Sequence, residues 1–119
     1  MAKTIIDDKA RVENMITNID YCIAKINSVK YEEFIENIDI RYAISMAMQI
    51  VCESAIHLTG ETKNKYKDIE WNEMTTIRNI ISHEYGALNL EIIYNTIKND
   101  FPGLKEKLNI VLERLNNGS

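Results

Sequence analysis

The sequence predicts an all-α protein, a bundle of about five helices, and three observations support that prediction. The chain of 119 residues contains one proline and four glycines, few for a protein rich in strands or turns. Apolar residues make up 45% of it, enough for one hydrophobic core. They recur at intervals of three and four, and no segment alternates strictly as a half-buried strand would. We therefore expect one helical domain over residues 1–116 and a flexible tail at 117–119.

The first predicted helix covers about residues 4–28. Thr4 can cap it, and Asp7 and Asp8 fall in its first turn, where the helix dipole favours negative charge. One apolar stripe follows at helical spacing: Val12, Met15, Ile16, Ile19, Cys22, Ile23, Ile26 and Val29. A short acidic segment at 31–36 then forms a turn or a single helical turn.

The second long helix begins at Asn37 or Asp39, since either residue can cap it. Its predicted buried face includes several small residues, so that a neighbouring helix can approach closely: Ile40, Ala43, Ile44, Ala47, Ile50, Val51, Ser54, Ala55 and Leu58. Gly60 is the predicted stop. His57 lies in the last turn, and we interpret it as a structural or surface residue.

Three shorter helices complete the predicted bundle. A polar, lysine-rich segment at 61–70 precedes a third helix at 71–86. Asn89 can cap a fourth helix. The chain is then expected to change direction, with Asp100 capping the last helix and Pro102 in its first turn.

The charge and the cysteines limit the possible functions. A net charge of −4 excludes nucleic-acid binding by general electrostatics, so any contact with RNA must be local or rely on a second subunit. Cys22 and Cys52 lie in apolar helical patterns without CxxC spacing, which predicts buried free thiols rather than a metal site. No apolar signal region begins the sequence, and the most apolar stretch, 43–52, is too short to span a bilayer. We expect a cytoplasmic protein without membrane contact.

The residues suited to chemistry are Arg78-Asn79 and His83-Glu84-Tyr85. Arginine keeps its charge and presents a planar fork to phosphate oxygens, and histidine exchanges a proton near neutrality. Taken alone, Arg78 could simply pair with a carboxylate, and His83 could simply end a helix. Five residues turn an ideal α-helix by about 500°, which places these two side chains about 140° apart. A shared site therefore needs the helix to end near His83, or two chains to pool their motifs across a two-fold axis.

This block resembles the R-x4-H motif of HEPN domains and, more closely, the RX4HXY motif of HepT-like toxins. The similarity covers about residues 40–108, because further segments follow the family's order and spacing: 41–44, 49–55, Trp71, 89–94 and 100–104. Glu84 differs, since many relatives have glycine there.

The resemblance implies a homodimeric, metal-independent ribonuclease without a cofactor, the toxin of a bacterial or archaeal toxin–antitoxin pair. Arg78 and His83 would be catalytic, with Asn79 and Tyr85 in support. His83 would transfer the proton as an RNA 2′-hydroxyl attacks the adjacent phosphate, and Arg78 would stabilise the phosphoryl charge. A minimal nucleotidyltransferase antitoxin would neutralise the toxin by transferring AMP to Tyr85.

Two alternatives stay open from the sequence. Asn79 could equally be an ordinary amide on a helix surface. The whole chain could be a non-catalytic HEPN binding module or scaffold that partners a nucleotidyltransferase, a role that the acidic balance and Glu84 favour.

Overall fold

The computed structural model of the protein describes residues 5–83 and 87–118, and all regular secondary structure in these ranges is helical. The described elements, in chain order, are α1 (Ile5–Ser28), α2 (Tyr31–Glu36), α3 (Ile38–Ile56), α4 (Gly60–Lys65), α5 (Trp71–His83), α6 (Ala87–Asn95), the π-helical segment η1 (Thr96–Asp100) and α7 (Phe101–Asn116). The all-α prediction is confirmed.

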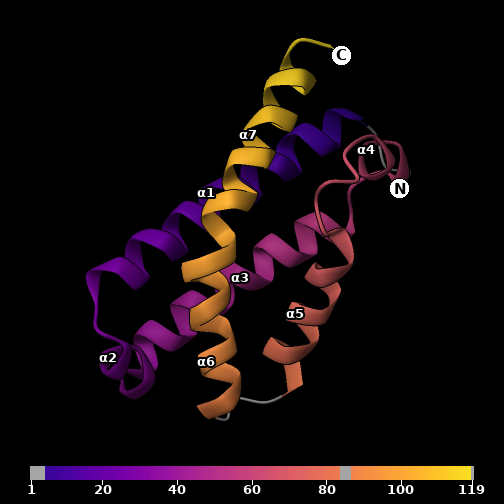
Figure 1. The fold of residues 1–119 in the computed structure, drawn as a ribbon. Coiled ribbons are helices and arrows are strands. Elements are labelled where there is room, and N and C mark those ends of the chain that lie inside the picture. The colour runs from indigo at the N-terminus through magenta and orange to yellow at the C-terminus, as the bar shows by residue number, and fades with distance from the viewer. Residues whose placement is uncertain (1–4, 84–86, 119) are drawn as a thin grey trace.

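The two long helices α1 and α3 form an antiparallel hairpin closed by α2 (Figure 1). α7 packs across α1, and α5 packs against α3. The segments α6, η1 and α7 follow one another as a single long helical run that crosses the hairpin (Figure 1). In this arrangement one side of α5 packs against α3, and another side faces η1 and the beginning of α7.

The core lies between these helices and uses most residues of the predicted stripes. The prediction that Ile50 is buried is wrong, because Ile50 lies on the outer side of α3 with Tyr42 and Met46 and is 36% exposed. The first stripe supplies five fully buried residues: Val12, Met15, Ile19, Cys22 and Ile26. They meet the small and apolar residues of α3, of which Ala47 and Ala55 let the two helices approach closely. Burying one large apolar side chain contributes about 1.5–3 kcal/mol, so this seam is the main stabilising contact of the hairpin.

The ends of α3 differ in how well they were predicted. Asn37 is its cap, because the Asn37 side-chain oxygen accepts hydrogen bonds from the backbone nitrogens of Asp39 (3.0 Å) and Ile40 (3.2 Å). The prediction that Gly60 stops the helix is wrong, since α3 already ends at Ile56 and Gly60 begins α4. The reason is local: Thr59 caps α4 by accepting from the Thr62 nitrogen (3.2 Å).

The start of the C-terminal run also differs from expectation. Asn89 does not cap α6, which already begins at Ala87. Asp100 has helical backbone angles (φ −104°, ψ −36°) and no side-chain capping bond, so the chain does not break direction there. Instead η1 carries the helix through to Pro102, in the first turn of α7. A wider π turn accommodates a proline that would clash with the preceding turn of an α-helix.

The predicted cap Thr4 and predicted stop Gly86 lie outside the described residues.

A buried carboxylate ties the beginning of α1 to the α3–α4 connection. Asp8 is fully buried and accepts three hydrogen bonds, from the Thr59 nitrogen (3.0 Å), the Thr59 hydroxyl (2.6 Å) and the Thr62 hydroxyl (2.6 Å). The cap of α4 and the first turns of α1 are therefore fixed by one side chain.

Asp8→Ala is expected to lower the free energy of unfolding by about 2–4 kcal/mol, because it leaves buried donors without an acceptor. Urea denaturation followed by circular dichroism measures the change. The matched control is Glu13→Ala, an exposed acid on the same helix, which should change stability by less than about 0.5 kcal/mol. Equal effects of the two substitutions would contradict this role of Asp8.

Cys22 and Cys52 are buried free thiols, as predicted. Burial raises the pKa of each thiol from 9.0 to about 12. For Cys52 the neighbouring Glu53 raises the pKa further, while Arg78 lowers it. The stabilising effect of the neutral thiols is therefore complete below pH 9 and is lost as the pH rises toward 12, since the unfolded chain ionises first.

Unfolding experiments across that range should show this loss. We expect stability to fall by up to about 1.4 kcal/mol per pH unit for each thiol. In the double variant Cys22→Ala, Cys52→Ala the stability should fall less steeply with pH, because the two thiols no longer contribute. Some decline should remain, because other groups also titrate at high pH. An identical slope in both proteins would contradict the assignment.

Candidate functional site

The candidate site is built on α5, which is fixed at its beginning and along one side. The Trp71 indole nitrogen donates to the Tyr66 carbonyl (3.1 Å), which anchors the first turn. Met74 and Ile81 are buried, and Ile77 packs partly against the core. This apolar side determines the rotation of the helix and so directs Arg78 toward α3.

Arg78 meets a carboxylate at the α3–α5 seam. Its Nη1 atom lies 3.3 Å from Oε1 of Glu53, and the two side chains are 34% and 41% exposed. The other carboxylate oxygen of Glu53 lies 3.6 Å from Nε2 of His57. One carboxylate thus links the arginine of α5 to a histidine at the end of α3.

The ion pair orients the guanidinium more than it stabilises the fold. Exposed and half-exposed pairs contribute between zero and about 1 kcal/mol, so an incoming phosphate can replace Glu53 at little cost. Arg78 remains accessible for such a replacement. Arg78 therefore does pair with a carboxylate, as the sequence allowed, but this pair leaves its guanidinium available to bind a phosphate.

The remaining predicted site residues are only partly described. Asn79 is exposed on α5. The backbone of His83 is described as the last residue of α5, but its side chain, Glu84 and Tyr85 lie outside the described residues. The expectation that Arg78 and His83 converge on one phosphate is thus not tested by this geometry.

Sequence reasoning did not place Glu53 and His57 at the site. His57 is exposed, in keeping with its interpretation as a surface residue, yet it touches the partner of Arg78. The four-residue spacing of Glu53 and His57 was a visible signal for their own contact. Nothing in the spacing showed that Glu53 would face Arg78, because that contact depends on how α3 packs against α5.

An exposed apolar stripe runs along α3 toward this site. It consists of Ile38, Tyr42, Met46 and Ile50, which recur every fourth residue and are 36–61% exposed. Glu53 continues the same side of the helix. An exposed apolar row of this kind commonly marks a surface that another protein covers.

Within residues 5–83 and 87–118, no three His, Cys, Asp or Glu side chains are grouped so that they could hold a metal ion. In the same part of the chain, no helix has the length and apolar character needed to cross a bilayer.

The sequence profile of the family described as "Ribonuclease HepT-like" matches residues 15–111, a span that includes α3, α5 and Arg78. The chain belongs to the HepT-like ribonuclease family. The family resemblance noted from the motif is therefore confirmed.

Relatives of this HepT-like chain match it over most of their length. "Putative RNase MJ1380" of Methanocaldococcus jannaschii is 30% identical over 105 residues, covering 88% of this chain and 96% of the relative. "Putative RNase TTE0752" of Caldanaerobacter subterraneus subsp. tengcongensis is 23% identical over 103 residues, or 87% and 92%. "Probable ribonuclease HepT" of Thermococcus cleftensis is 24% identical over 99 residues, or 83% and 90%. No solved structure matches the chain significantly.

Proposed function

We propose that this HepT-like chain is a metal-independent endoribonuclease, the cytoplasmic toxin of a toxin–antitoxin pair, with Arg78 and His83 as its catalytic residues. The observation that carries the proposal is the position of Arg78. It lies within the segment that matches the ribonuclease family, on a helix anchored at both its first turn and its apolar side, with its guanidinium partly exposed.

In the proposed reaction an RNA 2′-hydroxyl attacks the adjacent phosphorus, and the bond from phosphorus to the 5′-oxygen of the next nucleotide breaks. The products are a 2′,3′-cyclic phosphate and a free 5′-hydroxyl. His83 transfers the proton, and Arg78 stabilises the charge on the phosphoryl oxygens. Asn79, exposed one residue after Arg78, would contact the RNA backbone or orient His83.

Glu53 is proposed as the positioning residue of this site. It holds the guanidinium of Arg78 at the α3–α5 seam until the substrate phosphate takes its place. A guanidinium that is already oriented loses less conformational freedom when it binds phosphate.

Glu53→Ala is expected to lower kcat/KM for RNA cleavage about tenfold or more, because Arg78 is then no longer oriented. Steady-state kinetics on a short labelled RNA measures the loss, and thermal unfolding should show little change in stability. Glu91→Ala, an exposed acid on α6, is the matched control and should leave kcat/KM within about twofold. A higher kcat/KM in Glu53→Ala would show that Glu53 competes with substrate, and would contradict a positioning role.

We further propose a homodimer in which the α3 stripe is the contact surface. Pairing two stripes would cover Tyr42 and Met46, the most exposed apolar side chains of α3. Because Glu53 continues this side of the helix, the two Arg78 residues would lie near the same seam. A chain with a net charge of −4 does not attract RNA by its overall charge, and two arginines in one groove would supply the local positive charge that RNA binding needs.

The proposed function is tested with the protein purified without its partner. We expect cleavage of single-stranded RNA in the presence of EDTA, with a 2′,3′-cyclic phosphate at the new end, and growth arrest on expression. A protein that neither cleaves RNA nor arrests growth would refute the proposal.

A non-catalytic binding module is the second candidate. It is favoured by the pairing of Arg78 with Glu53 and by the acidic balance of the chain. In that case Arg78 would contact a nucleotide or a nucleotidyltransferase partner. Glu84→Gly discriminates the two candidates: inactive wild type with active Glu84→Gly would mean that the anion at residue 84 silences a competent site, whereas inactivity of both favours the binding module.

A further inference from the structure

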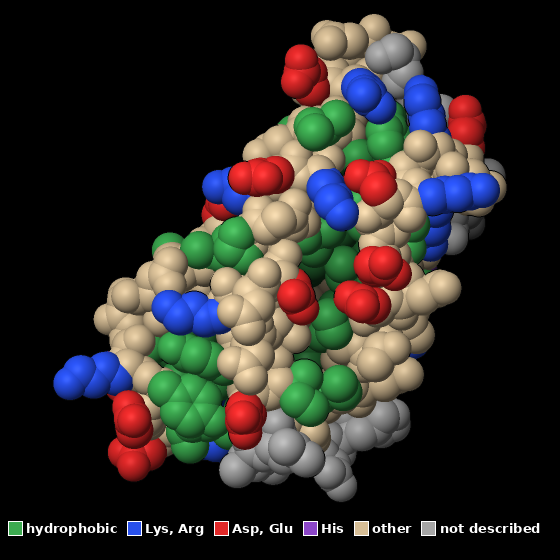
Figure 2. Space-filling view, viewed as in Figure 1, with side chains coloured by type: hydrophobic (Ala, Val, Ile, Leu, Met, Phe, Trp, Pro, Cys, Tyr) green, Lys and Arg blue, Asp and Glu red, His purple; other side chains and the backbone are tan. Residues whose placement is uncertain are grey.

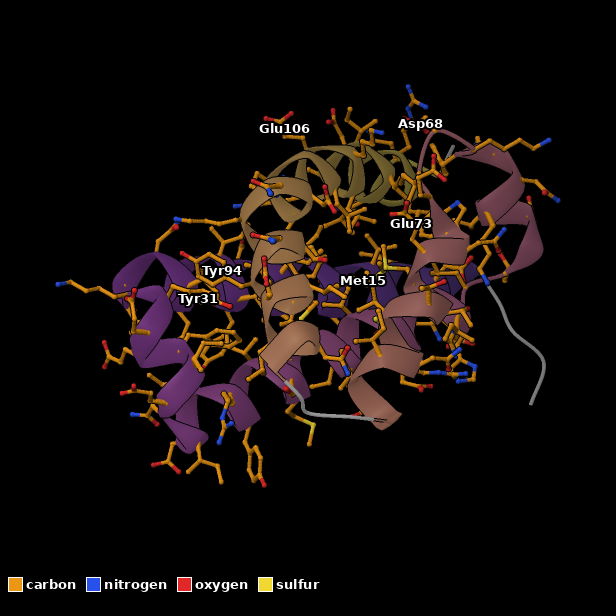
Figure 3. All side chains as sticks on the ribbon, turned by 60° about the horizontal axis from the view of Figure 1, so that its bottom comes forward. Met15, Tyr31, Asp68, Glu73, Tyr94 and Glu106 are labelled. Atoms are coloured by element: carbon orange, nitrogen blue, oxygen red, sulfur yellow. The ribbon has the colours of Figure 1, made fainter. Side chains whose placement is uncertain are left out.

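A cleft of about 370 Å³ lies on a different side of α5 from Arg78. It is bounded by the first two turns of α5, by η1 and by the beginning of α7. Figure 2 shows apolar side chains in the hollow with acidic side chains around it. In Figure 3, Glu73 lies between the start of α5 and α7. Because Arg78 faces α3 instead, an occupant of this cleft would not cover it.

The rim of the cleft is acidic. Glu70 directly precedes α5, Glu73 lies in its first turn, and Asp100 comes from the end of η1. Among the described residues, none of these three carboxylates forms an ion pair. The one lysine of the lining, Lys107, donates its ammonium to the Asp68 carbonyl (2.7 Å). The rim therefore repels phosphate-bearing ligands and attracts cationic groups.

The floor of the cleft is apolar and the hollow is open. Met74 and Phe101 form its buried base, and Leu104 lines it from α7. Gly103 also lines it, and a Cβ atom added there would meet no atom within 4 Å. The π-helical segment contributes to the wall, and such segments often occur at functional sites. An apolar floor beneath an acidic rim suits a ligand that is both apolar and cationic.

We infer that this cleft is the docking site for a basic, amphipathic segment of a protein partner. Apolar side chains of that segment would cover Met74 and Phe101, and its lysine or arginine side chains would reach Glu70, Glu73 and Asp100. RNA does not fit, since its phosphates would meet three carboxylates. The inference does not depend on the nuclease proposal. It does imply that a partner holds α5, the helix that carries Arg78, from the side away from the α3–α5 seam.

The test uses the full chain and a fluorescently labelled peptide in which two arginines flank leucines at helical spacing. Fluorescence anisotropy should show saturation below about 1 mM. Backbone amide shifts in NMR spectra should localise to the start of α5, η1 and Gly103. A peptide with glutamate in place of both arginines should not bind.

Two variants separate the charge of the cleft from its volume. Glu73→Lys should weaken peptide binding about tenfold or more, and Gly103→Leu should block it by filling the hollow without a change of charge. The matched controls are Glu91→Lys on α6 and Gly60→Leu at the start of α4, where an added Cβ also meets no atom within 4 Å. Both controls should bind within about twofold of wild type.

Three results would overturn the inference. The first is the absence of saturable binding by the arginine peptide. The second is an equal loss in Glu91→Lys, which would show a general effect of net charge. The third is a single-stranded RNA that shifts the same cleft amides with equal affinity. Circular dichroism of each variant confirms that it is folded, and RNA cleavage is assayed separately so that failure of the nuclease proposal leaves this test intact.

Discussion

Arg78→Ala and His83→Ala are each expected to abolish RNA cleavage and growth arrest while the helical fold survives. Loss of a positioned general acid or base typically costs about 10²–10⁴-fold in rate. Loss of a preorganised donor to the reacting group costs about 10²–10³-fold. The ion pair of Arg78 with Glu53 is half exposed, so its removal should lower stability by less than about 1 kcal/mol. Cleavage of labelled RNA and far-ultraviolet circular dichroism measure the two effects separately.

Two control variants sharpen this result. Arg78→Lys keeps the charge but loses the planar fork, and we expect it to recover only part of the activity. Arg114→Ala removes an exposed arginine at the end of α7 and should cleave RNA within about twofold of wild type. If Arg78→Ala cleaves as fast as wild type, then Arg78 is not part of the catalytic site and the proposed site is wrong.

Mixing the two inactive proteins tests whether the motifs are pooled across a dimer. If one chain supplies Arg78 and the other supplies His83, then a mixed dimer retains one complete site and should regain activity. If each chain carries its own complete site, the mixture stays inactive. Either outcome resolves how two side chains about 140° apart on an ideal helix could serve one phosphate.

The core was predictable from the sequence because apolar spacing is a local property that burial enforces. The stripe from Val12 to Ile26 is buried on α1, and Asn37 caps α3 as one of two predicted candidates. Asp100 shows where the same reasoning fails. An aspartate two residues before a proline is typical of a cap, but a π turn lets the helix continue through it.

The candidate site was predictable only in part, because its residues come from two helices. Arg78 was recognisable from its spacing to His83 within one segment. Its partner Glu53 lies 25 residues earlier, and only the packing of α3 against α5 brings the two together. Glu70, Glu73 and Asp100 likewise became a group only when η1 approached the first turns of α5. Long-range pairings of polar side chains leave no periodic signal in a sequence.

Tyr85 carries the last prediction, which concerns how the proposed toxin is silenced. It follows His83 by two residues and directly precedes Gly86, outside the described residues. We propose that the phenolic oxygen of Tyr85 attacks the α-phosphorus of ATP in the active site of a minimal nucleotidyltransferase. Pyrophosphate leaves, and the phenolic proton passes to the solvent or to a base of that enzyme. The added phosphodiester would place an anion beside Arg78, which binds phosphate oxygens strongly through its planar fork.

Incubation with the cognate nucleotidyltransferase, ATP and Mg²⁺ is therefore expected to add AMP to Tyr85 and to stop RNA cleavage without unfolding the protein. Peptide mass spectrometry locates the adduct, and cleavage assays follow the loss of activity. Tyr85→Phe should keep the fold and escape silencing, whereas Tyr21→Phe, which alters an exposed tyrosine of α1, should be silenced like wild type. The proposed mechanism requires a covalent bond between the Tyr85 phenolic oxygen and the phosphorus of AMP, because only then can a tyrosine-linked phosphate occupy Arg78. Complete inhibition with no adduct, or with an adduct on another residue, would therefore refute it and indicate that the partner inhibits by covering the site.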